Sequence, residues 1–263
     1  MVYYRTLLLG LLCLLISSGS QMCKAQSNEN LIISNALRYL DTPYVPHTLD
    51  NNIAEELIVN KKEVDCTTFV EYVLAESLSQ SPNNTDGLTE EDFLTRIRYR
   101  YGFISGYPSR LHYTSEWIKE GVKNQFIKDI TRIYSTDSMY VALSYMTEHP
   151  TFYKHLAKSP ENVAAMKQIE KDVSGDLIRF LPKDKVPEQG LYWIKNGDIL
   201  CFTVGIKGLD VSHMGFAYYQ NNKLHLLHAS YPYGKVIVDP NSVSTMLKKN
   251  RNWTGIRVLR PQL

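Results

Sequence analysis

The sequence predicts an α+β fold, with helices in the first part of the chain and an antiparallel sheet in the last part. Apolar residues repeat at helical spacing up to residue 172, and after residue 190 they alternate in short runs separated by Gly, Asn and Pro. Helices followed by a meander of strands indicate the α+β class. The expected helices are 30–42, 66–80, 88–100, 135–147 and 160–172, and the expected strands are GDILCFTV, VSHMGFAYY, KLHLLHAS, KVIVD and GIRVLR.

The first 25 residues match a secretory signal peptide. Arg5 supplies a positive charge, an uninterrupted apolar run spans residues 7–16, and the small residue Ala25 ends the segment. The apolar run is shorter than the roughly 20 residues of a membrane-spanning helix. An N-terminal anchor that is never cleaved is the alternative. We expect cleavage after Ala25 and an exported protein, periplasmic or in the cell envelope, with no stable membrane insertion afterwards.

Composition predicts a globular enzyme-sized domain without nucleic-acid partners. The chain is 44% hydrophobic and 21% charged, which is ordinary for a folded protein. Loss of Arg5 and Lys24 with the signal segment reduces the 29 basic residues to 27, which equals the 27 acidic residues. This balance gives no reason to expect nucleic acid or an anionic membrane as partner. We expect one domain over residues 26–263, with a helical insertion at about 85–190.

Two cysteines remain after signal cleavage, Cys66 and Cys201. Cys201 lies in the middle of a predicted strand between apolar neighbours, so we expect a core thiol. A single disulfide between the two is conceivable in an oxidising compartment. No CxxC pair or Cys/His zinc spacing occurs, so no metal site is expected.

The helix predicted at 66–80 begins with a cysteine. Asp65 is placed to cap it, and SPNN ends it. A helix N-terminus lowers the pKa of a cysteine through its partial positive charge and free N–H groups, and the thiolate is the nucleophile. The alternative is a structural cysteine in the core, because Cys66 also belongs to an apolar stripe. The stripe comprises Cys66, Phe69, Val70, Val73, Leu74 and Leu78.

Two histidines fall on strands that a QNNK turn joins into a hairpin. His213 shares its face with the small residues Val211, Gly215 and Ala217, so we expect a helix to approach that face closely. The opposite face carries Met214, Phe216 and Tyr218. In the hairpin, His213 and His228 are expected to be neighbours. A histidine that takes the thiol proton, oriented by a third polar group, completes a cysteine nucleophile, although a lone strand histidine is usually structural.

These motifs resemble those of a known family. GDILCF and SHMGFAYYQNNKLHLLHAS resemble the GDLxFF…SHVGIYxGxxxxxHAS signature of NlpC/P60 cell-wall peptidases, and DCTTFVEYVLA resembles their DCSGLV helix. PYVxxTLD, DCTTFVE and YGFISGYPSRLHYTSEW are similar to the DUF1460 group, described as N-acetylmuramoyl-L-alanine amidase-like. The resemblance runs from about residue 30 to the C-terminus. It implies a papain-like α+β fold, with the cysteine helix packed on a small antiparallel sheet.

The resemblance also implies residue roles. Cys66 would be the nucleophile, His213 the base and His228 the residue that orients it, with no metal or organic cofactor. Tyr44, from the loop TPY, would contact substrate or assist the oxyanion. The aromatic and basic segment around residue 113, expected to be mostly loop, is placed near the substrate through Arg110, His112, Tyr113 and Trp117. Packing within the protein is the alternative for all five. Departures from the family pattern put the shape of the subsites in doubt; they are Asp41, Pro46, His47, Thr67 and Thr68.

The resulting hypothesis is an exported cysteine amidase that hydrolyses the N-acetylmuramoyl–L-alanine bond of peptidoglycan or its fragments. The same three residues could instead cleave the γ-D-glutamyl–diamino acid bond of stem peptides, because they respond only to an amide. A wall-binding protein without catalysis is the third hypothesis. Other polar residues carry no functional prediction: Asp198 is expected to shape a turn, and His149 and His155 to lie on the surface.

Overall fold

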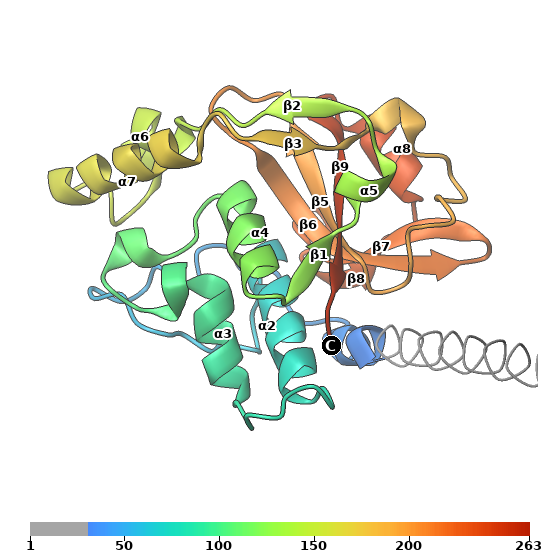
Figure 1. The fold of residues 1–263 in the computed structure, drawn as a ribbon, viewed down its shortest axis with the longest axis horizontal. Coiled ribbons are helices and arrows are strands. Elements are labelled where there is room, and N and C mark those ends of the chain that lie inside the picture. The colour runs from blue at the N-terminus through green and yellow to red at the C-terminus, as the bar shows by residue number, and fades with distance from the viewer. Residues whose placement is uncertain (1–30) are drawn as a thin grey trace, which may run out of the picture.

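The computed structural model describes residues 31–263, so the predicted signal segment lies outside the described residues. Helices and an antiparallel sheet make up the described chain, which confirms the α+β prediction (Figure 1). Helices α2 (Cys66–Ser79), α3 (Glu90–Arg98) and α4 (Thr114–Lys123) lie together beside the sheet. No helix between residues 31 and 263 is long and apolar enough to cross a membrane.

The main sheet has seven antiparallel strands in the order β1-β9-β5-β6-β7-β8, with β4 also paired to β9. The predicted meander is present as β5 to β8, and β9 returns to pair with the other side of β5. Asn221 and Asn222, both at positive φ, form the predicted tight turn between β6 and β7. The strands are β1 (Ile127–Asp129), β4 (Leu181–Pro182), β5 (Ile199–Val204), β6 (Val211–Gln220), β7 (Lys223–Ser230), β8 (Lys235–Val238) and β9 (Trp253–Pro261).

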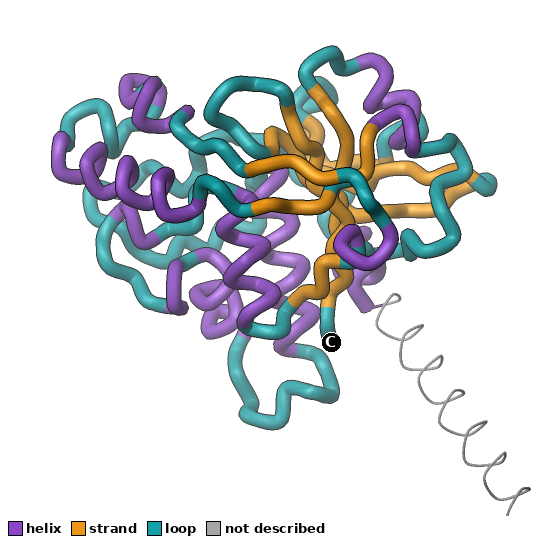
Figure 2. The backbone as a smooth tube through the Cα atoms, turned by 45° about the horizontal axis from the view of Figure 1, so that its top comes forward, coloured by secondary structure: helices purple, strands orange, loops and turns teal. Residues whose placement is uncertain are grey.

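Each face of this sheet has its own apolar cluster. On one face α2 packs against β6, where the rings of Phe69 and Phe216 lie edge to face at 5.5 Å. On the other face α8 (Val243–Lys249) packs with residues of β5 and β7. In Figure 2 the strands gather in one half of the molecule and most helices in the other. The sheet therefore joins the elements that carry the predicted cysteine and histidines.

Residues 85–190 contain strands as well as helices. Strands β1 and β4 of this segment belong to the main sheet, and β2 pairs with β3 in a separate two-stranded sheet. A third apolar cluster lies under α6 and α7. The remaining elements are η1 (Arg100–Gly102), η2 (Tyr107–Ser109), α5 (Thr131–Tyr134), β2 (Ser138–Tyr140), α6 (Tyr145–Glu148), η3 (Pro150–Phe152), α7 (Pro160–Val173), β3 (Leu177–Arg179) and η4 (Lys183–Lys185).

Most predicted helices are confirmed, and one is wrong. The helices expected at 66–80, 88–100 and 160–172 are α2, α3 and α7, and the helix expected at 30–42 is helical over residues 31–37. The segment 135–147 is mainly extended, because its burial alternates from residue 138 to 143 and β2 pairs with β3. The segment expected to be mostly loop before residue 118 contains the start of α4.

Candidate active site

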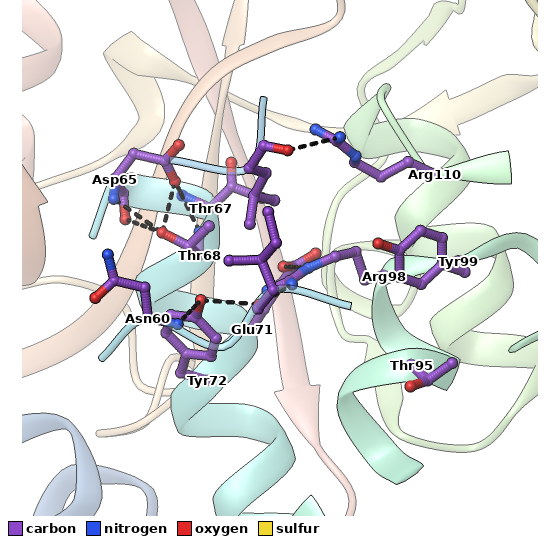
Figure 3. A network of polar contacts seen from close by, with 12 residues as sticks. Asn60, Asp65, Thr67, Thr68, Glu71, Tyr72, Thr95, Arg98, Tyr99 and Arg110 are labelled. Atoms are coloured by element: carbon purple, nitrogen blue, oxygen red, sulfur yellow. Dashed lines mark hydrogen bonds and ion pairs between the residues drawn. The ribbon is translucent and has the colours of Figure 1, made fainter. Parts of the chain in front are cut away.

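Cys66 is the first residue of α2, and the predicted cap is present. Oδ1 of Asp65 accepts hydrogen bonds from the backbone N–H groups of Thr67 and Thr68 at 3.0 and 2.8 Å, as Figure 3 shows. The Asp65 N–H in turn donates to the hydroxyl of Thr68 at 2.9 Å, which completes a capping box. Thr68, one of the departures from the family pattern, thus stabilises the helix start. These contacts fix the position of Cys66.

Buried polar contacts attach the loop before α2 to its neighbours (Figure 3). Arg98 of α3 donates from Nε to Glu71 of α2 and from Nη1 to the carbonyl of Ile58, both at 2.7 Å. The hydroxyl of Tyr72 accepts from the backbone N–H of Asn60 at 2.9 Å and donates to the Ile58 carbonyl. Because Glu71 and Arg98 are both buried, removing either partner would leave an uncompensated charge. The loop that leads to Cys66 is therefore attached to both α2 and α3.

The surroundings of Cys66 keep its thiol protonated in the free protein. Burial, and next the charge of Asp65, raises the pKa of Cys66 to about 12, although the backbone N–H of Met214 and the hydroxyl of Thr67 oppose the shift. The backbone N–H of Cys66 at the helix start acts in the expected direction and lowers this pKa, but desolvation outweighs it, so the net shift is upward. The side chain is partly buried and not disulfide-bonded. Its contact with Met214 places the sulfur one residue from His213.

An irregularity in β6 changes the predicted faces of the strand. His213 pairs with Phe202 and Val211 pairs with Thr203, so Ser212 is an extra residue in the strand. Val211 therefore packs in the α2 cluster, on the side opposite to that expected. The helix that covers the small-residue face is α8, in the cluster that contains Ala217, whereas α2 packs against Met214 and Phe216 on the opposite face.

A side chain from β9 covers this irregularity. Nε1 of Trp253 donates to the Ser212 hydroxyl at 2.9 Å, and its ring is nearly parallel to that of His213 at 6.0 Å. Trp253 is itself only partly buried. His213 thus lies beside a bulged backbone and an aromatic ring, and the sequence patterns did not single out Trp253.

His213 and His228 are brought together as the sequence predicted. Nε2 of His213 lies 2.6 Å from Nδ1 of His228. Gly215, between them in the hairpin, permits this approach, because a Cβ there would lie 2.8 Å from the Cβ of His228 and from the Leu227 carbonyl oxygen. Burial and then His228 lower the pKa of His213 to about 3, with Asp239 acting in the opposite direction. His213 is therefore neutral at physiological pH.

Asp239 extends this pair and was not singled out in the sequence. It follows β8, and its Oδ2 lies 3.4 Å from Nε2 of His228. Burial alone would raise the pKa of Asp239, but the approach of His228 and hydrogen bonds from Asn241 outweigh burial and hold the pKa below its ordinary value. The available signal was an acidic residue directly after a strand that pairs with the histidine strand. That signal depends on knowing that β8 pairs with β7.

Tyr44 lies beside Cys66 at the edge of the sheet. The Tyr44 N–H donates to the Gly234 carbonyl at 2.8 Å, and Tyr44 also bridges to Val64, two residues before Cys66. Burial, and next the neighbouring Cys66, raises the pKa of Tyr44, so its hydroxyl stays protonated and can donate. Its ring meets that of Tyr231 edge to face at 5.6 Å. Tyr231 is exposed and is a further surface residue that the sequence did not suggest.

The four residues expected near the substrate make their contacts within the protein. Arg110 is buried and pairs with Asp50 at 2.9 Å and Glu55 at 2.7 Å. Trp117 is buried within α4, and Tyr113 is buried and donates to Glu170 at 2.7 Å. His112 contacts the Tyr107 carbonyl at 3.0 Å, and burial, followed by the charge of Arg110, lowers its pKa to about 3. Arg110, Tyr113 and Trp117 are thus packed in the interior, as the alternative interpretation of this segment expected, and their contact with substrate stays a prediction.

The remaining predictions concern residues away from Cys66. Cys201 is a buried free thiol, so no disulfide joins it to Cys66. Oδ2 of Asp198 accepts from the Lys195 N–H at 2.8 Å, which supports the predicted turn. His149 and His155 are partly exposed and contact aromatic rings. Within residues 31–263 no group of three or more Cys, His, Asp or Glu side chains could hold a metal ion.

Comparison with known proteins identifies close relatives. The model of the N-acetylmuramoyl-L-alanine amidase-like family matches residues 34–256. A crystal structure of an N-acetylmuramoyl-L-alanine amidase from Bacteroides uniformis is 51% identical, with a TM-score of 0.86 over 90% of this chain and 100% of that chain. A Bacteroides fragilis structure, of a protein described as a xylanase candidate, is 52% identical, with a TM-score of 0.83 over 86% and 99%. No curated protein matches the chain.

A more distant structure shows how far the fold extends. A Legionella pneumophila protein of the DUF1460 family is 22% identical, with a TM-score of 0.69 over 94% of this chain and 96% of that chain. At this identity the likeness concerns the fold alone. The family model and the Bacteroides uniformis relative each cover most of the chain and share the described architecture. The chain belongs to the N-acetylmuramoyl-L-alanine amidase-like family.

Proposed function

We propose that this protein is a cysteine amidase that hydrolyses the bond between N-acetylmuramic acid and L-alanine in peptidoglycan or its fragments. The observation that carries the proposal is the His213–His228 contact of 2.6 Å directly beside Met214, whose N–H contacts the sulfur of Cys66. The family and the Bacteroides uniformis amidase supply the substrate class. The membership of the wider NlpC/P60 superfamily and a papain-like fold are part of the same proposal.

Attack begins from a neutral thiol and a neutral imidazole. Because His213 uses Nε2 to contact His228, Nδ1 is the atom that takes the thiol proton as Cys66 Sγ bonds to the lactyl carbonyl carbon. The carbonyl oxygen becomes an oxyanion, which the free backbone N–H of Cys66 at the first turn of α2 can stabilise. The protonated Tyr44 hydroxyl beside Cys66 is a second donor.

The intermediate then breaks down in two steps. The C–N bond breaks, and the proton on His213 passes to the L-alanine nitrogen, so a free stem-peptide amine leaves and a muramoyl thioester remains. Water next loses a proton to His213 and adds to the thioester carbonyl. The C–S bond breaks, and the proton returns from His213 to the sulfur of Cys66. No metal or organic cofactor takes part in these steps.

The xylanase description of the Bacteroides fragilis relative is not the function that this site favours. Glycoside hydrolysis generally needs two carboxyl groups that flank the scissile bond, one of them acting as an acid. Of the two carboxylates nearest the sulfur and the histidines, Asp65 accepts the N–H groups of α2 and Asp239 faces His228. Both are occupied with orienting other groups. A cysteine with paired histidines fits acyl transfer better.

The alternative bond is the γ-D-glutamyl–diamino acid link of stem peptides, and a wall-binding protein without activity is the other rival. Digestion of a defined muropeptide followed by mass spectrometry separates all three. Release of an intact stem peptide with a free L-alanine amine supports the amidase proposal. Release of L-Ala-D-Glu instead would move the scissile bond, and an unchanged muropeptide would favour binding alone. We also propose that the protein acts after export, in the periplasm or cell envelope.

A further inference from the structure

We propose that Asp239 is a positioning residue that sets which nitrogen of His213 is free to act as the base. The inference rests on the proposed function, in which His213 receives the Cys66 proton. Its basis is a continuous chain of side chains from β6 to the end of β8. Nε2 of His213 lies 2.6 Å from Nδ1 of His228, and Nε2 of His228 lies 3.4 Å from Oδ2 of Asp239.

Asp239 is held so that one oxygen faces His228. Its Oδ1 accepts hydrogen bonds from the backbone N–H and the side-chain amide of Asn241, at 2.8 and 3.0 Å. Its backbone N–H donates to the Leu226 carbonyl at 2.8 Å, and its own carbonyl accepts from Nδ1 of His225 at 2.9 Å. The side chain is almost fully buried. These contacts on both sides leave Oδ2 for His228.

The arrangement of donors and acceptors then fixes each proton. An ionised carboxylate only accepts, so Nε2 of His228 carries the hydrogen. Within residues 31–263 this buried nitrogen has no hydrogen bond, and Oδ2 of Asp239, 3.4 Å away, is the acceptor that we propose for it. With the ring hydrogen of His228 on Nε2, Nδ1 of His228 is an acceptor and Nε2 of His213 donates to it. The Nδ1 of His213 is therefore left with a lone pair.

Loss of the carboxylate would remove this bias. His228 could then carry its hydrogen on Nδ1 and donate to Nε2 of His213, and the His213 hydrogen would move to Nδ1. That tautomer cannot take a proton from Cys66. Asp239 also opposes the burial that lowers the pKa of His213, so it stabilises the imidazolium formed during attack. Asp239 acts through His228 and does not itself touch the substrate.

Nitrogen-15 NMR of histidine-labelled protein at neutral pH tests the proposal without any substrate. In the parent protein we expect a protonated Nε2 and a bare Nδ1 on both His213 and His228. In D239N, which keeps the shape of the side chain, we expect the Nδ1–H tautomer of His228 to appear. A parent spectrum with the hydrogen on Nδ1 of His213 would overturn the proposal, even if D239N does not fold. A wrong choice of scissile bond would leave these spectra unchanged.

Kinetics supply the second test. We expect D239N to lower kcat by about 10- to 100-fold with little change in KM, since loss of a residue that orients a functional side chain typically has an effect of this size. In a His228→Ala background the same substitution should cost nothing further, because its effect passes through His228. The matched control is D176N, the same substitution at an exposed carboxylate that pairs with Lys119; its kcat should stay near the parent value. A D239N loss that persists without His228 would refute the proposed route.

Discussion

The His213–His228 pair and the segment 107–117 carry similar chemistry but use it differently. Both combine imidazole, aromatic and charged groups. The guanidinium of Arg110 donates hydrogen bonds to Asp50, Glu55 and a backbone carbonyl. A ring nitrogen of His112 contacts the Tyr107 carbonyl. His213 uses only Nε2, and no residue from 31 to 263 hydrogen-bonds to its Nδ1. A side chain available for chemistry therefore differs from a structural one in having a reactive atom without a hydrogen bond, and residue type alone does not show this difference.

Exposure supports the same distinction. Cys66 and His213 are both partly exposed, whereas Arg110, Tyr113 and Trp117 are buried. The charge of Arg110 is balanced by acidic residues about 60 positions earlier in the chain, and that of Glu116 by Arg100. The site instead concentrates its polar groups along one line from β6 to β8. The two regions should therefore respond to substitution in opposite ways, one through activity and the other through stability.

The largest expected effect is loss of the nucleophile. Cys66→Ala should reduce muropeptide hydrolysis by about 10⁴-fold or more, because the covalent route disappears. The matched control is Cys201→Ala, which removes the buried thiol of β5 and should leave kcat near the parent value. Product formation is measured by chromatography and mass spectrometry. Equal hydrolysis by the Cys66 variant would refute the mechanism.

The second effect concerns stability. Arg110→Ala removes the guanidinium that pairs with the largely covered carboxylates of Asp50 and Glu55, so the free energy of unfolding should fall by about 3–5 kcal/mol. KM should stay near the parent value when it is measured well below the unfolding transition. Chemical denaturation gives the first quantity and steady-state kinetics the second. Lys119→Ala, which breaks the exposed pair with Asp176, is the control and should change neither.

A raised KM with an unchanged free energy of unfolding in Arg110→Ala would contradict the structural role of Arg110. Arg110 would then contact substrate, as the sequence originally suggested. Such a result would also show that the ion pairs with Asp50 and Glu55 open in solution. The comparison between the two regions would lose its physical basis.

The elements of the site that are local in sequence could be predicted, whereas their neighbours could not. The capped helix at Cys66 follows from Asp65 and the apolar period, and the hairpin that joins His213 to His228 follows from alternation and the Asn221–Asn222 turn. Each signal spans only a few residues along the chain. The α+β class could be predicted for the same reason.

The errors came from long-range contacts and from one extra residue. The additional residue Ser212 in β6 moves Val211 to the opposite face of the sheet. The alternation of apolar residues in the sequence does not reveal this bulge. The burial of Arg110 depends on the distant Glu55, and the role proposed for Asp239 depends on β8 lying beside β7. The mistaken helix at 135–147 is another case, because its strand β2 needs the partner β3. In each of these cases the structure depends on a contact with a residue that is distant in the sequence.

The third effect is a pH dependence of Cys66 reactivity. Because the pKa of Cys66 is raised to about 12, only the rising thiolate fraction reacts, and iodoacetamide alkylation should accelerate about tenfold per pH unit from about pH 6 to about pH 9. The rate is measured on residues 26–263 carrying Cys201→Ala, in which Cys66 is the single thiol. A rate that is flat across this range would indicate a thiolate–imidazolium pair in the free protein. A neutral His213, with its pKa at about 3, predicts no such plateau.

The smallest expected effect concerns substrate contact at the sheet edge. Tyr231 is 73% exposed and its ring meets Tyr44, which lies beside Cys66, so it can supply an apolar and hydrogen-bonding surface to the substrate. Tyr231→Ala should raise KM by roughly 3- to 10-fold and leave kcat nearly unchanged, since one exposed aromatic contact is worth about 1 kcal/mol. Tyr101, 76% exposed in η1, is the matched control, and Tyr101→Ala should alter neither constant. An equal effect of both substitutions would show that exposed tyrosines act on stability in general, whereas an effect of Tyr231 on kcat alone would place its hydroxyl in the chemical step.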